Sequence, residues 1–215
     1  MIMQGSEIHL FPVVVRNFQI PNHEQLNENL INFFRTYPAI QANIPEGVIT
    51  SRPDLHKVEE ECVQTIMGHF NDALEDYRQA YQLCCDRLDI TLCWFNHAPA
   101  RSGWGHPLHR HPMSYVSAVY YLTEGAPTIF DDPCTPRTSD TLDVWREDLM
   151  KSDLGINEKI DASPGQLIIF PAWLKHFSGR QMGHLDRWSM SFNAMPAGRV
   201  NIGPWGTPQL TVEYS

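Results

Sequence analysis

Apolar residues in the first third of the chain recur every three or four positions, which predicts two amphipathic helices. The first helix is expected to begin after Asn22, a residue suited to capping, and to end before Pro38. The second is expected to start near Ser51 or Asp54 and to run to about Cys85. Such stripes are typical of an outer layer that supports a sheet, and a surface for a protein partner is the alternative.

Beyond about residue 90 the pattern changes to short runs of β-branched and aromatic residues, separated by Gly, Pro, Asp and Ser. These runs predict strands at Ile90–Phe95, Tyr115–Leu122, Thr128–Phe130, Gln166–Phe170 and Trp188–Phe192. A further strand is expected near the start, within Ile8–Phe18. Many short strands without intervening helices indicate an antiparallel sandwich or rolled double sheet, and therefore an α+β fold.

The chain has 215 residues, a length that suits one domain. Within it, residues 1–88 are expected to provide a strand and the supporting helices. Residues 89–197 would form the β core, and residues 198–215 a C-terminal extension. The change of pattern near residue 88 thus separates two layers of one domain.

Composition narrows the class of protein. Apolar residues make up 42% and charged residues 19% of the chain, which excludes wholesale disorder. The net charge of −9 disfavours nucleic acid as a partner, because phosphate-backbone binders normally carry a basic field. No apolar run approaches the ~20 residues of a membrane span. We therefore expect a cytoplasmic protein without a membrane segment; the pattern does not predict its oligomeric state.

Five cysteines form no Cys-x-x-Cys pair, which disfavours a disulfide framework or a zinc ribbon. We expect free, buried thiols. Cys134, beside the expected mouth of the site described below, is either a reactive thiol or a small buried apolar residue, and we prefer the second interpretation.

Histidines are concentrated before the expected strand 115–122. His109 and His111 are two residues apart, so in an extended segment they project from one face and can share a metal ion. His106 is less suited, since Pro107 interrupts its spacing to His109. A reactive metal needs a third protein ligand, and His176, after a turn and a buried strand, offers it. The alternatives are a His-rich surface loop and a hydrogen-bonded core histidine.

Arg187 and Ser189 share a face at the head of the last predicted strand. A guanidinium and a hydroxyl side by side suit a carboxylate ligand in an otherwise apolar interior. The alternative is a structural ion pair between Arg187 and either Asp186 or Asp161.

The ordered motifs together resemble a known family. They are His109-x-His111, Tyr120-Tyr-Leu122, Thr128-Ile-Phe-Asp-Asp-Pro133, Ser163-Pro-Gly165, Phe170-Pro171, His176 and Arg187-x-Ser189. Over about residues 92–195, this series resembles the iron(II)/2-oxoglutarate-dependent oxygenases. More narrowly, it is similar to a bacterial and phage branch described only as oxygenases of that kind.

The resemblance implies a double-stranded β-helix (jelly roll) that holds Fe(II) in its mouth. His109 and His176 would be metal ligands, and Arg187, helped by Ser189, would bind the distal carboxylate of the co-substrate 2-oxoglutarate. The strands that carry Tyr120, Tyr121 and Asn96 would face the same cavity in part, so these residues are further candidates.

One position departs from the family pattern. The superfamily usually has a carboxylate where this chain has His111, and a neutral imidazole leaves the site one negative charge short. Either His111 is the third ligand of a three-histidine site, or a carboxylate such as Asp131 or Asp132 completes it. We prefer His111, because its spacing to His109 needs no further assumption.

These features favour a non-haem Fe(II) dioxygenase, a hydroxylase that consumes 2-oxoglutarate and dioxygen. Its substrate, a small molecule or a peptide, is not predicted. One alternative is a cupin-like metalloenzyme that uses three histidines without a keto acid, but such an enzyme has no need of Arg187-x-Ser189. The other is a catalytically inactive binding or scaffold protein that keeps the same fold.

Overall fold

The protein was studied as a computed structural model, which describes residues 13–40, 47–133, 157–201 and 209–214. Three helical segments precede most of the strands: α1 (His23–Phe34), a 3-10 turn (Leu55–Lys57) and α2 (Glu61–Ala80). The strands are β1 (Arg16–Gln19), β2 (Ala39–Ile40), β3 (Ile49–Ser51), β4 (Cys85–Ala98), β5 (Val116–Tyr121), β6 (Gly125–Asp131), β7 (Asn157–Ala162), β8 (Gln166–Pro171), β9 (His176–Ser178), β10 (Arg187–Val200) and β11 (Leu210–Val212).

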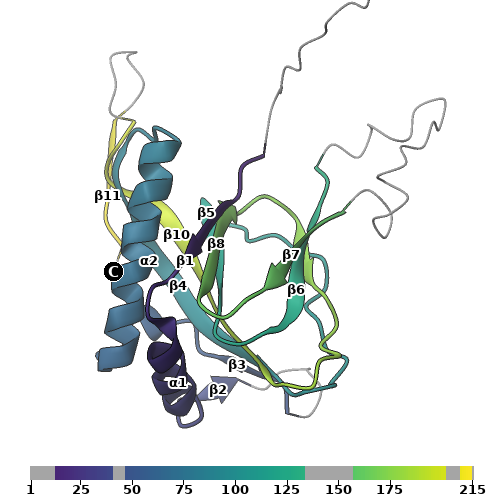
Figure 1. Ribbon diagram of the computed structural model, residues 1–215. Helices are drawn as coiled ribbons and strands as arrows, with labels where there is room; N and C mark the ends of the chain where they lie inside the picture. The colour runs from purple at the N-terminus through teal and green to yellow at the C-terminus, as the bar shows by residue number, and fades with distance from the viewer. Residues whose placement is uncertain (1–12, 41–46, 134–156, 202–208, 215) are drawn as a thin grey trace, which may run out of the picture.

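The strands form two antiparallel sheets (Figure 1). The larger sheet has the order β1-β8-β5-β10-β4-β3-β2, and β11 pairs with the far end of β10. The smaller sheet has the order β7-β6-β9. Non-consecutive neighbours such as β8 and β5 are typical of a rolled double sheet. This is the double-stranded β-helix, with N-terminal supporting helices, that the sequence predicts.

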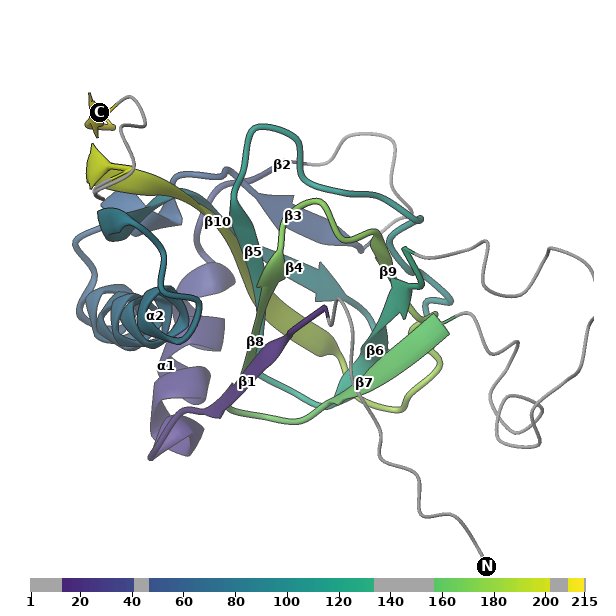
Figure 2. The same cartoon turned by 90° about the horizontal axis from the view of Figure 1, so that it is seen from above.

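The large sheet lies between the two helices on one face and the small sheet on the other (Figure 2). On one face, α1 and α2 pack against the sheet through side chains such as Leu30, Phe70 and Phe192, which are at most 1% exposed. On the other face, the small sheet encloses a smaller cluster around Tyr121 and Phe170. The predicted role of the helices as an outer layer is therefore confirmed.

The start of α2 was predicted wrongly. The sequence pattern placed it near Ser51 or Asp54, but α2 begins at Glu61 and ends at Ala80. Strand β3 occupies the earlier segment and pairs with β4, and the Ser51 hydroxyl accepts a hydrogen bond from the Phe95 amide. Pairing with a strand far along the chain overrides the local helical pattern.

Asn22 lies at the predicted N-terminal end of α1 but does not cap the helix with its side chain. Asn22 precedes the helix with a left-handed φ of 51°, and its side chain makes no capping hydrogen bond. The predicted strands from residue 90 onward all exist, although β4 and β10 are 14 residues long. The predicted opening strand, Ile8–Phe18, is found only in part: β1 begins at Arg16, residues 13–15 are not in a strand, and residues 8–12 lie outside the described residues.

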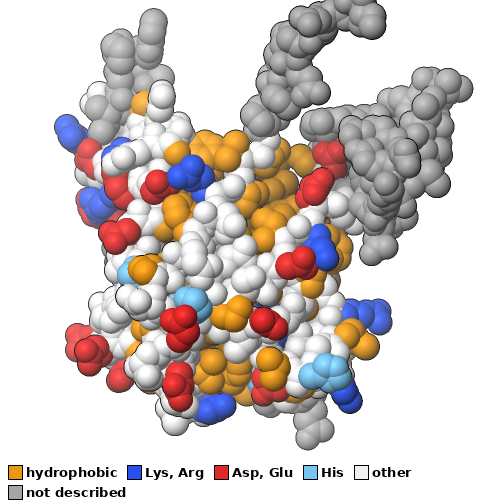
Figure 3. Space-filling model, in the orientation of Figure 1, with side chains coloured by type: hydrophobic (Ala, Val, Ile, Leu, Met, Phe, Trp, Pro, Cys, Tyr) orange, Lys and Arg blue, Asp and Glu red, His pale blue; other side chains and the backbone are white. Residues whose placement is uncertain are grey.

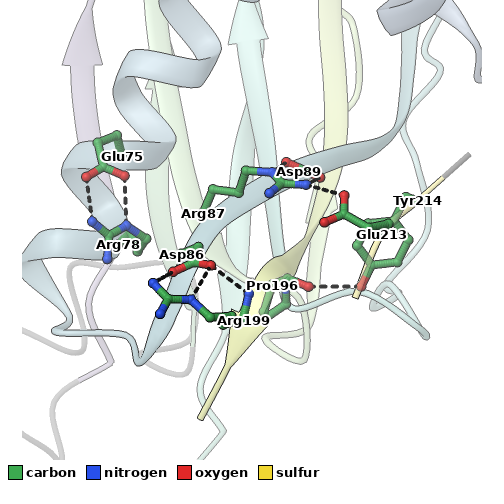
Figure 4. A network of polar contacts seen from close by, with 9 residues as sticks. All are labelled: Glu75, Arg78, Asp86, Arg87, Asp89, Pro196, Arg199, Glu213 and Tyr214. Atoms are coloured by element: carbon green, nitrogen blue, oxygen red, sulfur yellow. Dashed lines mark hydrogen bonds and ion pairs between the residues drawn. The ribbon is translucent and has the colours of Figure 1, made fainter. Parts of the chain in front are cut away.

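Ion pairs connect the end of β4 to its neighbours on the helical side of the molecule (Figure 4). Arg199 on β10 forms a two-point ion pair with Asp86, with nitrogen–oxygen distances of 3.0 and 3.1 Å. Arg87 contacts both Asp89 and Glu213. On the face seen in Figure 3, acidic and basic side chains are interspersed rather than gathered by sign.

Two further expectations concern the cysteines and the membrane. Cys62, Cys84, Cys85 and Cys93 are free thiols; Cys85 and Cys93 are buried as predicted, whereas Cys62 is half-buried and Cys84 is exposed. Cys134 lies outside the described residues. Among the described helices, none is both long and apolar enough to cross a bilayer.

Candidate functional site

Alternation along the strands separates the cavity face of the large sheet from its helical face. On β10, Arg187, Ser189 and Ser191 line the cavity, whereas the residues between them pack toward the helices. On β4, Trp94 and Asn96 also line it. The cavity has a volume of about 190 Å³ and lies between the two sheets.

Three histidines converge in this cavity. His109 and His176 form an antiparallel bridge, in which the amide of each donates to the carbonyl of the other at 2.9 Å. The His111 amide donates to the carbonyl of Ala172 at 3.0 Å, which holds the two segments side by side. One ring nitrogen of each histidine lies within 4.8 Å of the others, and Nε2 of His111 and Nε2 of His176 are 3.4 Å apart.

Backbone carbonyls fix the rings of His109 and His176. Nδ1 of His109 donates to the carbonyl of Pro107 at 2.7 Å, and Nδ1 of His176 donates to that of Leu174 at 3.0 Å. A carbonyl can only accept, so the proton of each neutral ring is on Nδ1, and Nε2 carries the free lone pair. This arrangement is typical of metal-binding histidines, whose other ring nitrogen is held by a hydrogen bond.

Burial keeps the imidazoles of His111 and His176 uncharged. The pKa of His111 falls to about 3, first through burial and then through the neighbouring His176 and His109. Burial also lowers the pKa of His176 to about 4. At neutral pH these rings are therefore in the neutral form that binds metal ions.

Among the described residues, no carboxylate joins the histidines. Within the described part of the chain, the one cluster that could hold a metal ion is His109, His111 and His176. Asp131, on β6, and Asp132 are not members of it. The arrangement thus favours the three-histidine alternative, in which His111 stands where the superfamily usually has a carboxylate.

Arg187 is a buried cation with no acidic partner among the described residues. Arg187 is only 6% exposed. Its Nε donates to the carbonyl of Ala126 at 3.0 Å, and its Nη1 donates to the hydroxyl of Ser189 at 2.9 Å. The guanidinium carbon lies 5.7 Å from the ring centre of Tyr121. Burial lowers the pKa of Arg187, yet a guanidinium stays protonated in proteins.

The structural alternative for Arg187 is not found. Asp186 instead bonds to His97 at 3.1 Å and to the amide of Ala100 at 2.9 Å. Asp161 pairs with Lys159 at 3.0 Å. A buried, unpaired charge lowers the stability of a fold by roughly several kcal/mol unless a ligand of opposite charge compensates it. An anionic ligand in the cavity would compensate the charge of Arg187.

Of the further candidate residues, Tyr120 lies outside the cavity. Tyr120 does not reach the cavity: it faces the helices, where its hydroxyl donates to Asn27 at 2.5 Å and its ring contacts Phe70. The alternation of β5 explains the correction, because Tyr121, its neighbour, points between the sheets and donates to Thr128. Asn96 lines the cavity as expected and accepts a hydrogen bond from Thr50.

His106 enters the cavity although its spacing argued against it. It lines the same space as the three histidines, and burial, together with the charge of Arg187, lowers its pKa to about 4. The close approach depends on Gly105, since a Cβ there would lie 2.7 Å from the carbonyl oxygens of Ser178 and Gly179. The His106 amide donates to the Ser178 hydroxyl at 2.7 Å, which fixes this segment.

Sequence reasoning also missed Ser191, Asn193 and Thr50. The first two continue the two-residue period of Arg187 and Ser189, so the signal was present in the predicted strand. Ser191 lines the cavity, and Asn193 contacts His111 at its edge. Thr50 lies in the segment that was expected near the start of a helix, and only its pairing with β4 brings it in.

The donor set fits a divalent transition metal. Metal–nitrogen bonds of about 2.1 Å require ligand nitrogens roughly 3 to 4 Å apart, and the three rings approach this spacing. Imidazole suits iron, copper, nickel and zinc rather than magnesium or calcium. The unpaired guanidinium beside these rings fits a metal ligand that also carries a carboxylate.

Known proteins share this architecture. A family described as "Putative 2OG-Fe(II) oxygenase" matches residues 92–193. A prolyl-4-hydroxylase from Pseudomonas putida is similar in structure, with a TM-score of 0.60 at 14% identity over 86% of this chain and 94% of that one. HygX from Streptomyces hygroscopicus, solved with nickel and 2-oxoglutarate, has a TM-score of 0.60 at 13% identity over 86% and 83%.

A prolyl hydroxylase from Trichoplax adhaerens, in complex with a hypoxia-inducible-factor peptide, has a TM-score of 0.53 at 13% identity over 85% and 83% of the two chains. No protein with a curated description matches the sequence. The matched segment runs from β4 to β10 and contains all three histidines and Arg187. Residues 92–193 therefore match a family of 2-oxoglutarate- and iron(II)-dependent oxygenases, and the chain shares the fold of solved proteins of this kind.

Proposed function

We propose that this protein is a non-haem iron(II) dioxygenase, a hydroxylase that couples the decarboxylation of 2-oxoglutarate to the oxidation of a substrate. One observation carries the proposal. The buried guanidinium of Arg187, without an acidic partner among the described residues, opens on the cavity where His109, His111 and His176 converge. A cation-binding group and an anion-binding group in one cavity suit a ligand that both chelates a metal and carries a distant carboxylate.

In this proposal His109, His111 and His176 hold the iron through Nε2. Bound iron would supply the dioxygen and one-electron chemistry that side chains cannot provide. One oxygen atom of dioxygen would enter a C–H bond of the substrate, and the other would enter succinate as 2-oxoglutarate loses carbon dioxide.

The protein's own groups bind and orient the co-substrate. Arg187 presents Nη2, which makes no hydrogen bond to the described residues, and Ser189 lies at 2.9 Å from Nη1. Together they would bind the distal carboxylate by charge-assisted hydrogen bonds. Three neutral imidazoles leave the two positive charges of the ion to be matched by the co-substrate. The guanidinium carbon lies over the ring of Tyr121, 5.7 Å from its centre.

A three-histidine metalloenzyme without a keto acid accounts for the imidazoles but gives Arg187 no role. An inactive scaffold accounts for neither, since nothing would then offset the cost of the buried charge. The substrate is proposed only as a small molecule or a peptide, with dioxygen as the second co-substrate. We also retain, as proposals, one domain with a supporting layer (1–88), a core (89–197) and an extension (198–215), and a cytoplasmic location.

Spectroscopy under anaerobic conditions tests the proposal. Purified protein with Fe(II) and 2-oxoglutarate should develop a weak visible charge-transfer band that saturates at one equivalent of each. Arg187→Ala should abolish the band at concentrations that saturate the wild type, and His176→Ala should also remove stoichiometric iron. Arg180→Ala, which changes an exposed arginine on the neighbouring loop, is the matched control and should keep the band.

An unchanged band in Arg187→Ala would show that the carboxylate assignment is wrong. Stoichiometric iron in His176→Ala would exclude this residue as a ligand. A wild-type protein that binds iron but shows no response to 2-oxoglutarate would favour the metalloenzyme without a keto acid.

A further inference from the structure

His111 differs from the other two histidines in what holds its ring. Among the described residues, no backbone carbonyl binds its Nδ1; instead, the side-chain amide nitrogen of Asn193 lies 3.4 Å from Nδ1. On its other side, Nε2 of His111 lies 3.4 Å from Nε2 of His176. Both neighbours of the His111 ring are therefore side-chain groups rather than fixed backbone.

These two contacts agree on one tautomer. Nε2 of His176 carries a lone pair, because its Nδ1 proton is donated to the Leu174 carbonyl, so the shared contact needs a proton on Nε2 of His111. The amide nitrogen of Asn193 can only donate, so it needs a bare Nδ1. Without metal, His111 is thus protonated at the nitrogen that a shared ion would have to contact.

A buried hydroxyl completes the chain of contacts. The Ser117 hydroxyl donates to the side-chain oxygen of Asn193 at 2.7 Å, and the two residues are opposite each other in the pairing of β5 with β10. Ser117 is 1% exposed and Asn193 3% exposed. A hydroxyl can donate or accept, so rotation of the amide by 180° would exchange its oxygen and nitrogen without loss of either hydrogen bond.

We propose that Asn193 and Ser117 form a reversible amide switch that converts His111 from a hydrogen-bond donor to His176 into a metal ligand. In the second state the amide oxygen of Asn193 accepts a hydrogen bond from the protonated Nδ1 of His111, and the amide nitrogen donates to the hydroxyl oxygen of Ser117. Nε2 of His111 is then free to bind the ion. The ring stays neutral throughout, because the proton only moves from Nε2 to Nδ1.

This inference rests on the proposed function, since it assigns a positioning role around the proposed ligand His111. Its consequence is specific to the third ligand. Backbone carbonyls hold the Nδ1 protons of His109 and His176 in both states, whereas Nε2 of His111, and with it the lone pair of His176, is freed only after the amide of Asn193 has rotated.

Nitrogen NMR of the metal-free protein tests the first state directly. Histidine ring signals, assigned with His111→Gln, should show His111 protonated at Nε2 and both His109 and His176 protonated at Nδ1. The latter two serve as internal controls in the same spectrum. A metal-free His111 that is protonated at Nδ1 would overturn the switch.

Two substitutions at residue 193 test the second state. Asn193→Asp offers an oxygen in both orientations, so His111 should move to the Nδ1-protonated form without metal and keep cobalt affinity close to that of the wild type. Asn193→Leu, of similar size but without polar atoms, should lose cobalt affinity by about 10- to 100-fold. Unchanged ring signals of His109 and His176 would show that each variant folds.

Isothermal titration with cobalt(II) and the visible spectrum of bound cobalt provide the metal readout. Wild-type affinity in Asn193→Leu would contradict the role of Asn193, as would loss of binding in a folded Asn193→Asp. If the wild type bound no cobalt, the proposed function would fail, while the nitrogen spectrum would still decide the tautomer of His111.

Discussion

The arginines near β10 and β11 and the arginine in the cavity differ in their partners and in their exposure. At the β10–β11 end, Arg78, Arg87 and Arg199 each bind carboxylates at 2.6 to 3.1 Å and are partly or largely exposed (Figure 4). In the cavity, Arg187 is 6% exposed and has no carboxylate partner among the described residues. The exposed arginines, whose charges water already screens, thus have carboxylate partners. Among the described residues, buried Arg187, whose charge water does not screen, has none.

The difference shows which arginines serve the fold. An exposed ion pair contributes little, on the order of 0–1 kcal/mol, and its loss is tolerated. A buried unpaired charge lowers stability, so the fold would be expected to lose it unless a ligand requires it. The four predictions that follow change one region to resemble the other, in order of decreasing effect.

Giving Arg187 an internal partner should have the largest effect. In Ser189→Asp a carboxylate would replace the hydroxyl that lies 2.9 Å from Nη1 and would compete with the co-substrate. We expect 2-oxoglutarate affinity of the iron-loaded protein to fall by at least about 100-fold, in line with the cost of disrupting a buried charged contact. Calorimetric titration under anaerobic conditions measures it.

Ser189→Asn is the control, since it has the same size without the charge. It should lose less than about 10-fold in affinity. Equal losses in the two variants would show that volume, not charge, is responsible, and the distinction between the two regions would then fail.

Removing the charges should change stability in opposite directions. Arg187→Met, which replaces the buried cation with an apolar side chain of similar length, should raise the free energy of unfolding of the ligand-free protein by about 1 to 3 kcal/mol. Arg78→Met, which breaks the ion pair to Glu75, should lower it by at most about 1 kcal/mol. Urea unfolding measures both, and a destabilised Arg187→Met would contradict the claim that the charge serves a ligand.

Acid should destabilise the two regions in different pH windows. The pKa values of His106, His111 and His176 are lowered to between about 3 and 4. The unfolded chain therefore binds protons that the folded protein excludes, and stability falls as the pH falls from 6.5 toward 4. The pKa of Glu75 is lowered to about 2 by hydrogen bonds from Arg78 and Gln79, so its contribution is lost from about pH 4.5 to 2.

Urea midpoints across this range separate the two windows. His106→Gln should flatten the upper window and leave the lower one unchanged, and Glu75→Gln should do the reverse. Each buried histidine adds up to about 1.4 kcal/mol per pH unit within its window. An upper window that survives His106→Gln with its full slope would contradict the cause assigned to His106.

The smallest effect is expected for the exposed pair of Asp86 and Arg199. Asp86→Asn should lower the thermal midpoint by less than Arg78→Met does. This decrease relative to the wild type should disappear in 1 M salt, which screens exposed charges. A decrease that persists in high salt would show that Asp86 acts through its hydrogen bond to the Arg199 amide instead.

Most of the fold could be predicted because its signals are local. The strands after residue 90 were found from β-branched and aromatic runs, and α1 from its stripe and the position of Asn22. The early start assigned to α2 failed because β3 is defined by its partner β4, and pairing between distant segments leaves no local signal. Short strands such as β2 and β9 are likewise defined by their partners.

The same distinction applies to the site. The positions of His109, His111, Arg187 and Ser189 followed from a two-residue period, and His176 from its place after a buried strand. Tyr120 was misplaced because a run of two tyrosines does not say which of them faces which side of the sheet. His106 was undervalued because its position depends on the close contact of Gly105 with the backbone of β9 and the residue after it, which spacing cannot show.

A crystal structure grown without oxygen, with manganese(II) in place of iron and with 2-oxoglutarate, tests the central claim most directly. Anomalous scattering should place one metal ion in contact with His109, His111 and His176, and the distal carboxylate of the co-substrate should lie on Arg187 and Ser189. A metal ion bound elsewhere, or a co-substrate that leaves the guanidinium of Arg187 without a partner, would contradict the account.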